Sequence, residues 1–235
     1  APGWKAGPLP EPALRSIYRE ICSAAQALTQ PRAVAFLGPA ATFTHQAAHD
    51  RFGSSVRYLP CETISDVFAV VEKRTADYGV VPIENSTDGA VTHTLDQLAE
   101  TPLKISAEIY LPISQCLVAA GPREQLRRLY SKPEAFGQCR RWLHENLPGV
   151  ELASASSTAR AAEIARDEPG SGALASSLAA ELYGLRILEH DIQDLGGNTT
   201  RFLVIARAYG PPSGRDKTSI LFAVRHKVGA LHDAL

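Results

Sequence analysis

The sequence contains no methionine in 235 residues, and cysteine and tryptophan are scarce, with four and two residues. The cysteines, Cys22, Cys61, Cys116 and Cys139, are far apart and form no C-x-x-C pair, which argues against a zinc knuckle, a redox motif or a disulfide framework. We expect them to be reduced and mostly buried. The absence of methionine even at position 1 suggests a piece of a longer polypeptide.

Long apolar runs and a charge excess are also absent. No segment approaches the roughly 18 consecutive apolar residues of a membrane-spanning helix, and the N-terminus lacks the charged-then-apolar order of a secretory signal. The 24 basic residues are balanced by 25 acidic ones, whereas nucleic-acid-binding proteins normally carry a basic surplus. We therefore expect a soluble, cytoplasmic protein of one or two domains, without nucleic-acid or membrane partners.

Several familiar catalytic motifs are missing. The sequence has no G-x-x-x-x-G-K-[ST] for nucleotide phosphates, no G-x-S-x-G of serine hydrolases and no G-x-G-x-x-G after a strand. His45 and His49 stand four residues apart, but Gln46 replaces the glutamate of H-E-x-x-H, so no metal site is predicted. We interpret the two histidines as part of a solvated helix face.

The first thirty residues predict one amphipathic helix. Leu14, Ile17, Ile21 and Leu28 recur at the spacing of a helical face, and Pro31 ends the pattern. A single helix cannot bury such a stripe by itself, so the stripe must pack on the rest of this chain, on a partner or on a domain that is missing here.

From residue 33 onward, short apolar runs alternate with helical patterns, which is typical of βαβ units and a parallel sheet. A longer run at 105–120 carries Pro112 and predicts a bent strand or a crossover between two lobes. One helix is expected over 133–147. After a linker at 210–214, the residues 217–224 predict a strand, and a helix follows from residue 229.

Three loops share one arrangement, in which an apolar strand ends in small or polar residues and a helix begins at once. They lie at 38–44, 84–89 and 154–158. Such loops supply helix N-caps and leave N–H groups and hydroxyls at the strand ends, where anions bind. Together with the segment 198–201, they would suit a small carboxylate ligand.

These loops carry five motifs in a fixed order. They are G-P-x-G-T-F-S at 38–44, P-I-E-N-S-x-x-G-x-V at 82–91, Y-S-x-P with a later Q-C at 130–139, S-T-A at 157–159 and N-x-T-R-F at 198–202. The chain thereby resembles the prephenate dehydratase family, in particular its bifunctional branch with a preceding chorismate mutase domain. Two positions depart from the pattern: Ala41 replaces a glycine, which raises the question of a positive φ, and Thr44 replaces a serine.

The resemblance implies a two-lobed α/β fold like that of type II periplasmic binding proteins, with mixed, mostly parallel sheets. Residues 1–32 would be a linker and the last helix of a truncated mutase domain, and 33–210 the dehydratase domain. Its first lobe would comprise about 33–112 and 190–210, and its second about 113–189. Residues 211–235 would be a linker and the start of a truncated ACT domain. A homodimer or larger assembly is also implied.

The implied activity is the decarboxylating dehydration of prephenate to phenylpyruvate, CO2 and water in phenylalanine biosynthesis, a lyase reaction that needs no cofactor. The resemblance places Thr200 as the central catalytic residue, which would polarise the leaving hydroxyl, and adds Asn85, Ser131 and Gln138. Arg201 could hold a carboxylate or be structural, and Glu84 is a possible proton source. The full set of expected substrate-binding residues is Thr42, Phe43, Thr44, Glu84, Ser86, Gly89, Ser157, Thr158, Asn198, Arg201 and Phe202.

Two alternatives remain open, an arogenate dehydratase and a binding module that closes on a small carboxylate without chemistry. Phenylalanine is the effector implied by the resemblance. Of its site the chain retains only Gly229, Ala230 and Leu231, and the second regulatory motif, E-S-R-P, does not occur. We therefore expect weak or no inhibition by phenylalanine.

Overall fold

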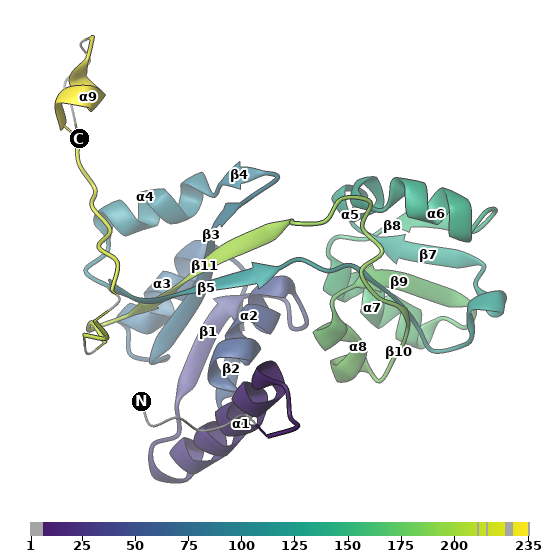
Figure 1. Cartoon of the computed structure of the whole chain (residues 1–235), viewed down its shortest axis with the longest axis horizontal. Coiled ribbons are helices and arrows are strands. Elements are labelled where there is room, and N and C mark those ends of the chain that lie inside the picture. Colours follow the sequence, from purple (N-terminus) through teal and green to yellow (C-terminus); the bar gives the residue numbers. More distant parts are fainter. Residues whose placement is uncertain (1–6, 211, 215, 224–227, 235) are drawn as a thin grey trace.

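The computed structural model describes residues 7–210, 212–214, 216–223 and 228–234. Two β-sheets form two lobes that lie next to each other, and helices cover both (Figure 1). The expected two-lobed α/β fold is thereby confirmed. Parts of the predicted terminal segments, at 1–6, 211, 215, 224–227 and 235, lie outside the described residues.

The first lobe is built on a sheet with the strand order β2-β1-β3-β11-β5, and β4 pairs with β3. Its strands are β1 (Ala33–Leu37), β2 (Arg57–Cys61), β3 (Tyr78–Asn85), β4 (Gly89–Ala90), β5 (Lys104–Pro112) and β11 (Thr199–Ala206). Its helices are α2 (Phe43–Phe52), α3 (Ile64–Glu72) and α4 (Thr92–Glu100). One apolar core packs α3 on one face of this sheet, and another packs α2 on the opposite face.

The second lobe is built on a sheet with the order β10-β6-β9-β7-β8. Its strands are β6 (Cys116–Ala119), β7 (Arg128–Ser131), β8 (Glu151–Ser154), β9 (Ser171–Ala175) and β10 (Arg186–Glu189). Its helices are α5 (Pro133–Gln138), α6 (Arg140–Asn146), α7 (Thr158–Asp167) and α8 (Ser177–Tyr183), and a 3-10 turn, η1, spans Arg123–Gln125. Alanines fill much of the core under α7 and α8, so helix and sheet approach closely.

Two segments connect the lobes and run beside each other. The first, 113–115, joins β5 to β6, so the run at 105–120 is two strands in different sheets. The second leads from β10 to β11, and the Ile113 N–H donates to the Asn198 carbonyl across the pair (2.8 Å). The chain crosses from the first lobe to the second and later returns. The four strands at these crossings therefore pair antiparallel with their neighbours; they are β5, β6, β10 and β11. Among the described residues, four strand pairs are parallel and five antiparallel, so the expectation of mostly parallel pairing is wrong.

Two further expectations need correction. The single helix expected at 133–147 is two helices, because the backbone at Cys139 departs from helical geometry (φ −113°, ψ 15°) and separates α5 from α6. The described residues 217–223 of the expected strand at 217–224 form no strand, and a short helix, α9 (Ala230–Ala234), follows. The prediction for cysteine is confirmed, since all four are free and only Cys22 is exposed.

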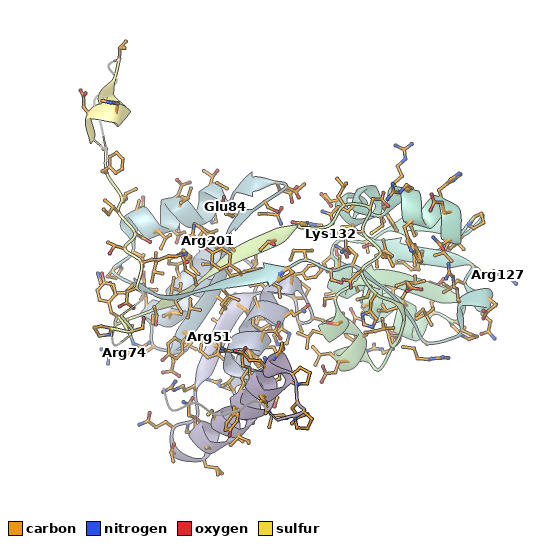
Figure 2. The ribbon with its side chains drawn as sticks, viewed as in Figure 1. Arg51, Arg74, Glu84, Arg127, Lys132 and Arg201 are labelled. Atoms are coloured by element: carbon orange, nitrogen blue, oxygen red, sulfur yellow. The ribbon has the colours of Figure 1, made fainter. Side chains whose placement is uncertain are left out.

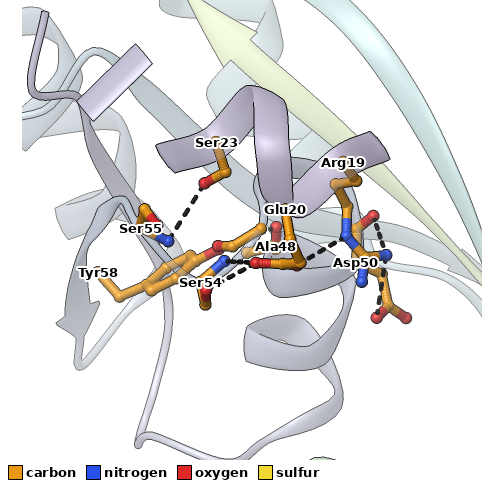
Figure 3. Close-up of polar contacts among 9 residues, drawn as sticks. Arg19, Glu20, Ser23, Ala48, Asp50, Ser54, Ser55 and Tyr58 are labelled. Carbon is orange, nitrogen blue, oxygen red and sulfur yellow. Dashed lines mark hydrogen bonds and ion pairs between the residues drawn. The ribbon is translucent and has the colours of Figure 1, made fainter. Parts of the chain in front are cut away.

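The N-terminal helix, α1 (Glu11–Thr29), contacts the first lobe through its polar face (Figure 3). The Glu20 carboxylate accepts hydrogen bonds from the N–H and hydroxyl of Ser54 (2.9 and 2.6 Å), and the Ser55 N–H donates to the Ser23 hydroxyl. The apolar stripe is left exposed at Ile17, Ile21 and Leu28. Within the described chain, no helix is both long and apolar enough to cross a membrane.

Candidate active site

A cavity of about 670 Å³ lies between the lobes and is lined by residues of both. Its walls are formed by the ends of β1, β3 and β11 on the first lobe and by the loops before α5 and α7 on the second. The predicted site residues that line this cleft are Thr42, Phe43, Thr44, Asn85, Gln138, Ser157, Thr158, Asn198, Thr200 and Phe202. Residues more than one hundred positions apart in the sequence therefore meet in one cavity.

Asn85 organises the first-lobe wall. Its Oδ1 accepts hydrogen bonds from the backbone N–H groups of Thr87 and Asp88 (2.8 and 3.0 Å). Because this oxygen is held, the amide nitrogen points toward β11, where it donates to Thr200 Oγ1 (2.8 Å) and Asn198 Oδ1 (2.9 Å). The hydroxyl oxygen of Thr200 is therefore an acceptor toward Asn85, and its proton is available for a group in the cleft.

Two helices begin at the cleft with side-chain caps. Thr42 caps α2 by accepting from the His45 N–H (3.4 Å), and Ser157 caps α7 by accepting from the Arg160 N–H (2.9 Å). These caps match the N-terminal signals expected at 38–44 and 154–158. The first-turn N–H groups and the helix dipoles make both ends favourable for anionic groups.

The second-lobe wall contributes cations that the sequence reasoning missed. Lys132, at the end of β7, and Arg160, in the first turn of α7, both line the cleft. Lys132 Nζ lies 3.9 Å from a Glu134 carboxylate oxygen, and an Arg160 nitrogen lies 2.5 Å from one of Glu163. Lys132 occupies the x of the Y-S-x-P motif, a position that the motif leaves unspecified. The sequence signal available for Lys132 was its position directly after a strand.

A hydrogen-bonded pair of glutamine side chains, Gln115 and Gln138, also lines the cleft. Gln138 Oε1 accepts from the Gln115 side-chain nitrogen (3.3 Å), and Gln115 itself is buried. This bond fixes the Gln138 carbonyl oxygen toward Gln115 and leaves its NH2 group as a neutral donor.

The remaining predicted site residues do not line the cleft. Ser131 is fully buried and donates its hydroxyl to the Leu174 carbonyl (2.9 Å), which joins β7 to β9. Ser86, in the turn after β3, and Gly89, the first residue of β4, are exposed, and the Ser86 hydroxyl accepts from the Thr199 N–H. The α9 segment with Gly229, Ala230 and Leu231 lies apart from both lobes in Figure 1.

Arg201 and Glu84 lie on the opposite face of their strands. Side chains alternate along a strand, so Thr200 and Phe202 face the cleft side and Arg201 faces away. Arg201 pairs with Glu108 and, at 3.7 Å, with Glu84, and these contacts raise the pKa of its guanidinium. Figure 2 shows Arg201 and Glu84 together on the first lobe, whereas Lys132 lies where the lobes meet. Arg201 is therefore held by carboxylates outside the cleft lining.

His45 corrects the interpretation of a solvated helix face. Its side chain is buried, its ring stacks on Phe36 with centroids 4.3 Å apart, and its Nδ1 accepts the Ala41 N–H (3.0 Å). Burial lowers its pKa to about 4, with a smaller contribution from His49. No cluster of three or more metal-ligating side chains occurs among the described residues.

A sequence model of prephenate dehydratase matches residues 34–209, which is most of the chain. The chain belongs to the prephenate dehydratase family. It is 51% identical to the bifunctional chorismate mutase/prephenate dehydratase of Aquifex aeolicus over 97% of its own length. The chain spans 64% of the length of that relative.

Solved structures agree on the fold of this family member. The prephenate dehydratase of Arthrobacter aurescens, solved in complex with L-Phe, is 34% identical with a TM-score of 0.68, over 79% of this chain and 63% of that one. A protein described as a quorum-quenching acylase, GqqA, is 29% identical with a TM-score of 0.72, over 86% of this chain and 75% of that one.

Proposed function

We propose that this chain catalyses the decarboxylating dehydration of prephenate to phenylpyruvate, CO2 and water. The observation that carries the proposal is the Thr200 hydroxyl, oriented by the Asn85 amide within a cleft whose opposite wall holds cations. Membership of the prephenate dehydratase family supports the same reaction.

The chemistry requires little from the protein beyond orientation and a hydrogen-bond donor. Prephenate loses its ring carboxylate as CO2, the electron pair of that bond enters the ring, and the ring expels hydroxide as it becomes aromatic. The departing oxygen gains negative charge, which a fixed donor stabilises. Thr200 fills this role, because its oxygen accepts from Asn85 and its O–H can donate a hydrogen bond to the leaving oxygen. A hydroxyl hardly ionises near pH 7, so Thr200 keeps its proton and polarises the leaving group, and a proton from hydronium or a buffer acid converts the departing hydroxide to water.

Substrate charge would be bound mainly by the second lobe. Prephenate is a dianion, and the cleft offers Lys132 and Arg160, which lie beside Glu134 and Glu163 in the same cleft, together with the N-terminal ends of α2 and α7. Thr200, Asn198 and Gln138 are neutral, so they can donate hydrogen bonds to oxygens without changing the charge balance, while both N–H groups of Asn85 are used on Thr200 and Asn198. Neither part of this proposal requires a cofactor.

The decisive experiment compares Thr200→Val with Thr200→Ser. We expect Thr200→Val to lower kcat by roughly 10²- to 10³-fold, the usual cost of removing one hydrogen-bond donor from an oxygen that gains negative charge. Thr200→Ser should keep kcat within about 10-fold of the native value, because it keeps the hydroxyl. Turnover is followed as phenylpyruvate, through its enolate absorbance in alkali.

Thr199→Val is the matched control. Thr199 precedes Thr200 on β11 but is not among the residues that line the cleft, so its substitution should leave kcat unchanged. Native turnover in folded Thr200→Val would contradict the proposed role. Binding of prephenate without turnover by the native chain would identify the carboxylate-binding module instead, and faster turnover of arogenate would identify an arogenate dehydratase.

We further propose that residues 33–210 form the dehydratase domain, between pieces of a mutase domain and an ACT domain. The match at 34–209 and the longer bifunctional relative support this division. Phenylalanine is proposed as the effector of the complete protein, and a homodimer or larger homo-oligomer as its assembly. The Arthrobacter aurescens relative, solved with L-Phe, supports the effector.

A further inference from the structure

One turn of the first lobe is inserted into the second. Ala41, between β1 and α2, is completely buried and packs in the core of the second lobe with Cys116, Ala159 and Ala175. The hydroxyl of Ser176, at the start of α8, donates to the Ala41 carbonyl (3.2 Å). This contact lies beside the cleft, because Pro39 and Thr42 on either side of Ala41 line it.

The conformation of this turn needs support. Ala41 has a φ of 67°, in the left-handed region that L-residues other than glycine rarely occupy. A residue held there persists when its surroundings impose the conformation. The Ala41 N–H donates to His45 Nδ1, and its carbonyl accepts from Ser176, so both polar backbone groups of Ala41 are held, one from each lobe.

The surroundings of His45 orient its ring so that Nδ1 accepts the Ala41 N–H. Its ring lies between Phe36, against which it stacks, and Tyr58, which it meets edge to face at 4.8 Å. Nδ1 can accept the Ala41 N–H only in the tautomer that carries its proton on Nε2. In the described structure, buried Nε2 has no hydrogen-bond partner. The fold thus leaves one polar atom of this histidine unsatisfied and keeps the bond from Nδ1 to Ala41.

We propose that His45 is a positioning residue, which holds the Ala41 turn in the second lobe and thereby sets the spacing between the two cleft walls. It contacts no group proposed to react, and it acts through the Ala41 backbone. The two walls must reach the same substrate, with Thr200 on one and Lys132 on the other. A misplacement of about 1 Å can lower the rate roughly 100-fold, so this spacing matters to prephenate turnover. The kinetic part of this inference rests on the proposed function.

Two substitutions separate positioning from stability. His45→Phe keeps the buried ring and removes the acceptor, and it also removes the unsatisfied Nε2–H. His45→Asn keeps an acceptor on Cγ, as in histidine, but loses the stacked ring and leaves a cavity. We expect His45→Phe to lower kcat/KM for prephenate by about 10-fold or more while Tm changes little. We expect His45→Asn to lower Tm further, yet to keep kcat/KM within about 3-fold of the native value.

Amide hydrogen exchange gives a readout that does not depend on the reaction. In His45→Phe the amide of Ala41 should exchange faster, and the segment around Ser176 should lose protection with it. His45→Asn should retain both. His49→Phe, one turn further along α2, is the matched control and should change neither exchange nor kinetics.

The outcomes distinguish this inference from the proposed function. Native exchange at Ala41 in His45→Phe, or a kcat/KM that follows Tm across the variants, would overturn the positioning role. If the native chain does not turn over prephenate, the proposed function fails, and the exchange data alone decide whether His45 holds the turn. Should His45→Phe not fold, Ser176→Ala removes the other bond to Ala41 and is expected to lower kcat/KM in the same way.

Discussion

At the scale of single residues, the candidate site depends on the orientation of the Asn85 side-chain amide. Asn85 is anchored by the Thr87 and Asp88 N–H groups, and only Oδ1 can accept from them. The nitrogen therefore faces Thr200, and the Thr200 hydroxyl is left to donate into the cleft. This arrangement fixes which group donates and which accepts in the hydrogen bonds that run from the turn after β3, through Asn85, to Thr200 on β11.

Asn85→Asp tests that direction with a nearly isosteric change. One carboxylate oxygen can still accept from Thr87 and Asp88, so the turn should be kept. The other faces Thr200 and Asn198 as an acceptor, so the hydroxyl would donate to it and not to the substrate, and the Asn198 amide would turn its NH2 group toward it. The new charge also opposes a dianionic substrate. We expect kcat/KM for prephenate to fall roughly 100-fold or more with little change in Tm. Native kinetics in this variant would show that the amide nitrogen has no part in the reaction.

Most of the site residues predicted from the sequence line the cleft, because strand-end loops and the family motifs coincide there. It did not distinguish the two faces of β11, so Thr200 and Arg201 were both assigned to the site although they point in opposite directions. Lys132 was missed because its motif position is unspecified. The burial of His45 was missed because a short polar helix gives no indication of which face packs on Phe36.

At the scale of elements, α1 shows that an apolar stripe does not identify the docking face. Glu20 and Ser23 make the contacts, and the close approach requires glycine at position 53, where an added Cβ would lie 2.6 Å from that of Ser23. The hydrogen bonds from Ser54, together with Arg19, lower the pKa of Glu20 to about 2. A carboxylate whose pKa is lower in the folded than in the unfolded state stabilises the folded state at pH values above its unfolded pKa, which is about 4.5 for Glu20.

Glu20→Gln should therefore unfold at a lower temperature than the native chain at pH 6. The difference should shrink as the pH falls from 4.5 toward 2, because the native carboxylate then becomes protonated. Thermal unfolding at several pH values measures this. Glu11→Gln, on the same helix and paired among the described residues with exposed Arg15, should differ little from the native chain at any pH. A pH-independent difference for Glu20→Gln would mean that packing, and not charge, attaches α1.

At the scale of the whole molecule, the two lobes contribute different chemistry to one cleft. The first supplies the neutral donors Asn198 and Thr200, with Asn85 orienting Thr200, and the carboxylate of Asp88. The second supplies the cations Lys132 and Arg160 with their carboxylate neighbours Glu134 and Glu163. The expected order of strands and helices predicted the two lobes well, because periodicity reports local structure. It could not predict the pairing of β11 between β3 and β5, which depends on contacts between distant segments.

This division predicts separate kinetic effects. Lys132→Met should raise KM for prephenate about 10-fold or more and change kcat less, since a charged contact present in both ground and transition states is lost. Arg127→Met is the matched control, because Arg127 precedes β7 and lies at the far end of the second lobe, whereas Lys132 follows the same strand (Figure 2). Equal effects of the two substitutions would indicate a general loss of positive charge.

The position of β11 also sets an order of assembly. The strands and helices of the second lobe are continuous in the sequence, from β6 to β10, so they can fold as soon as that segment has been synthesised. The sheet of the first lobe lacks an inner strand until residues 199–206 arrive and insert between β3 and β5. Thr200 is on that strand, so the hydroxyl proposed to act on the substrate enters the protein only with the step that completes the fold.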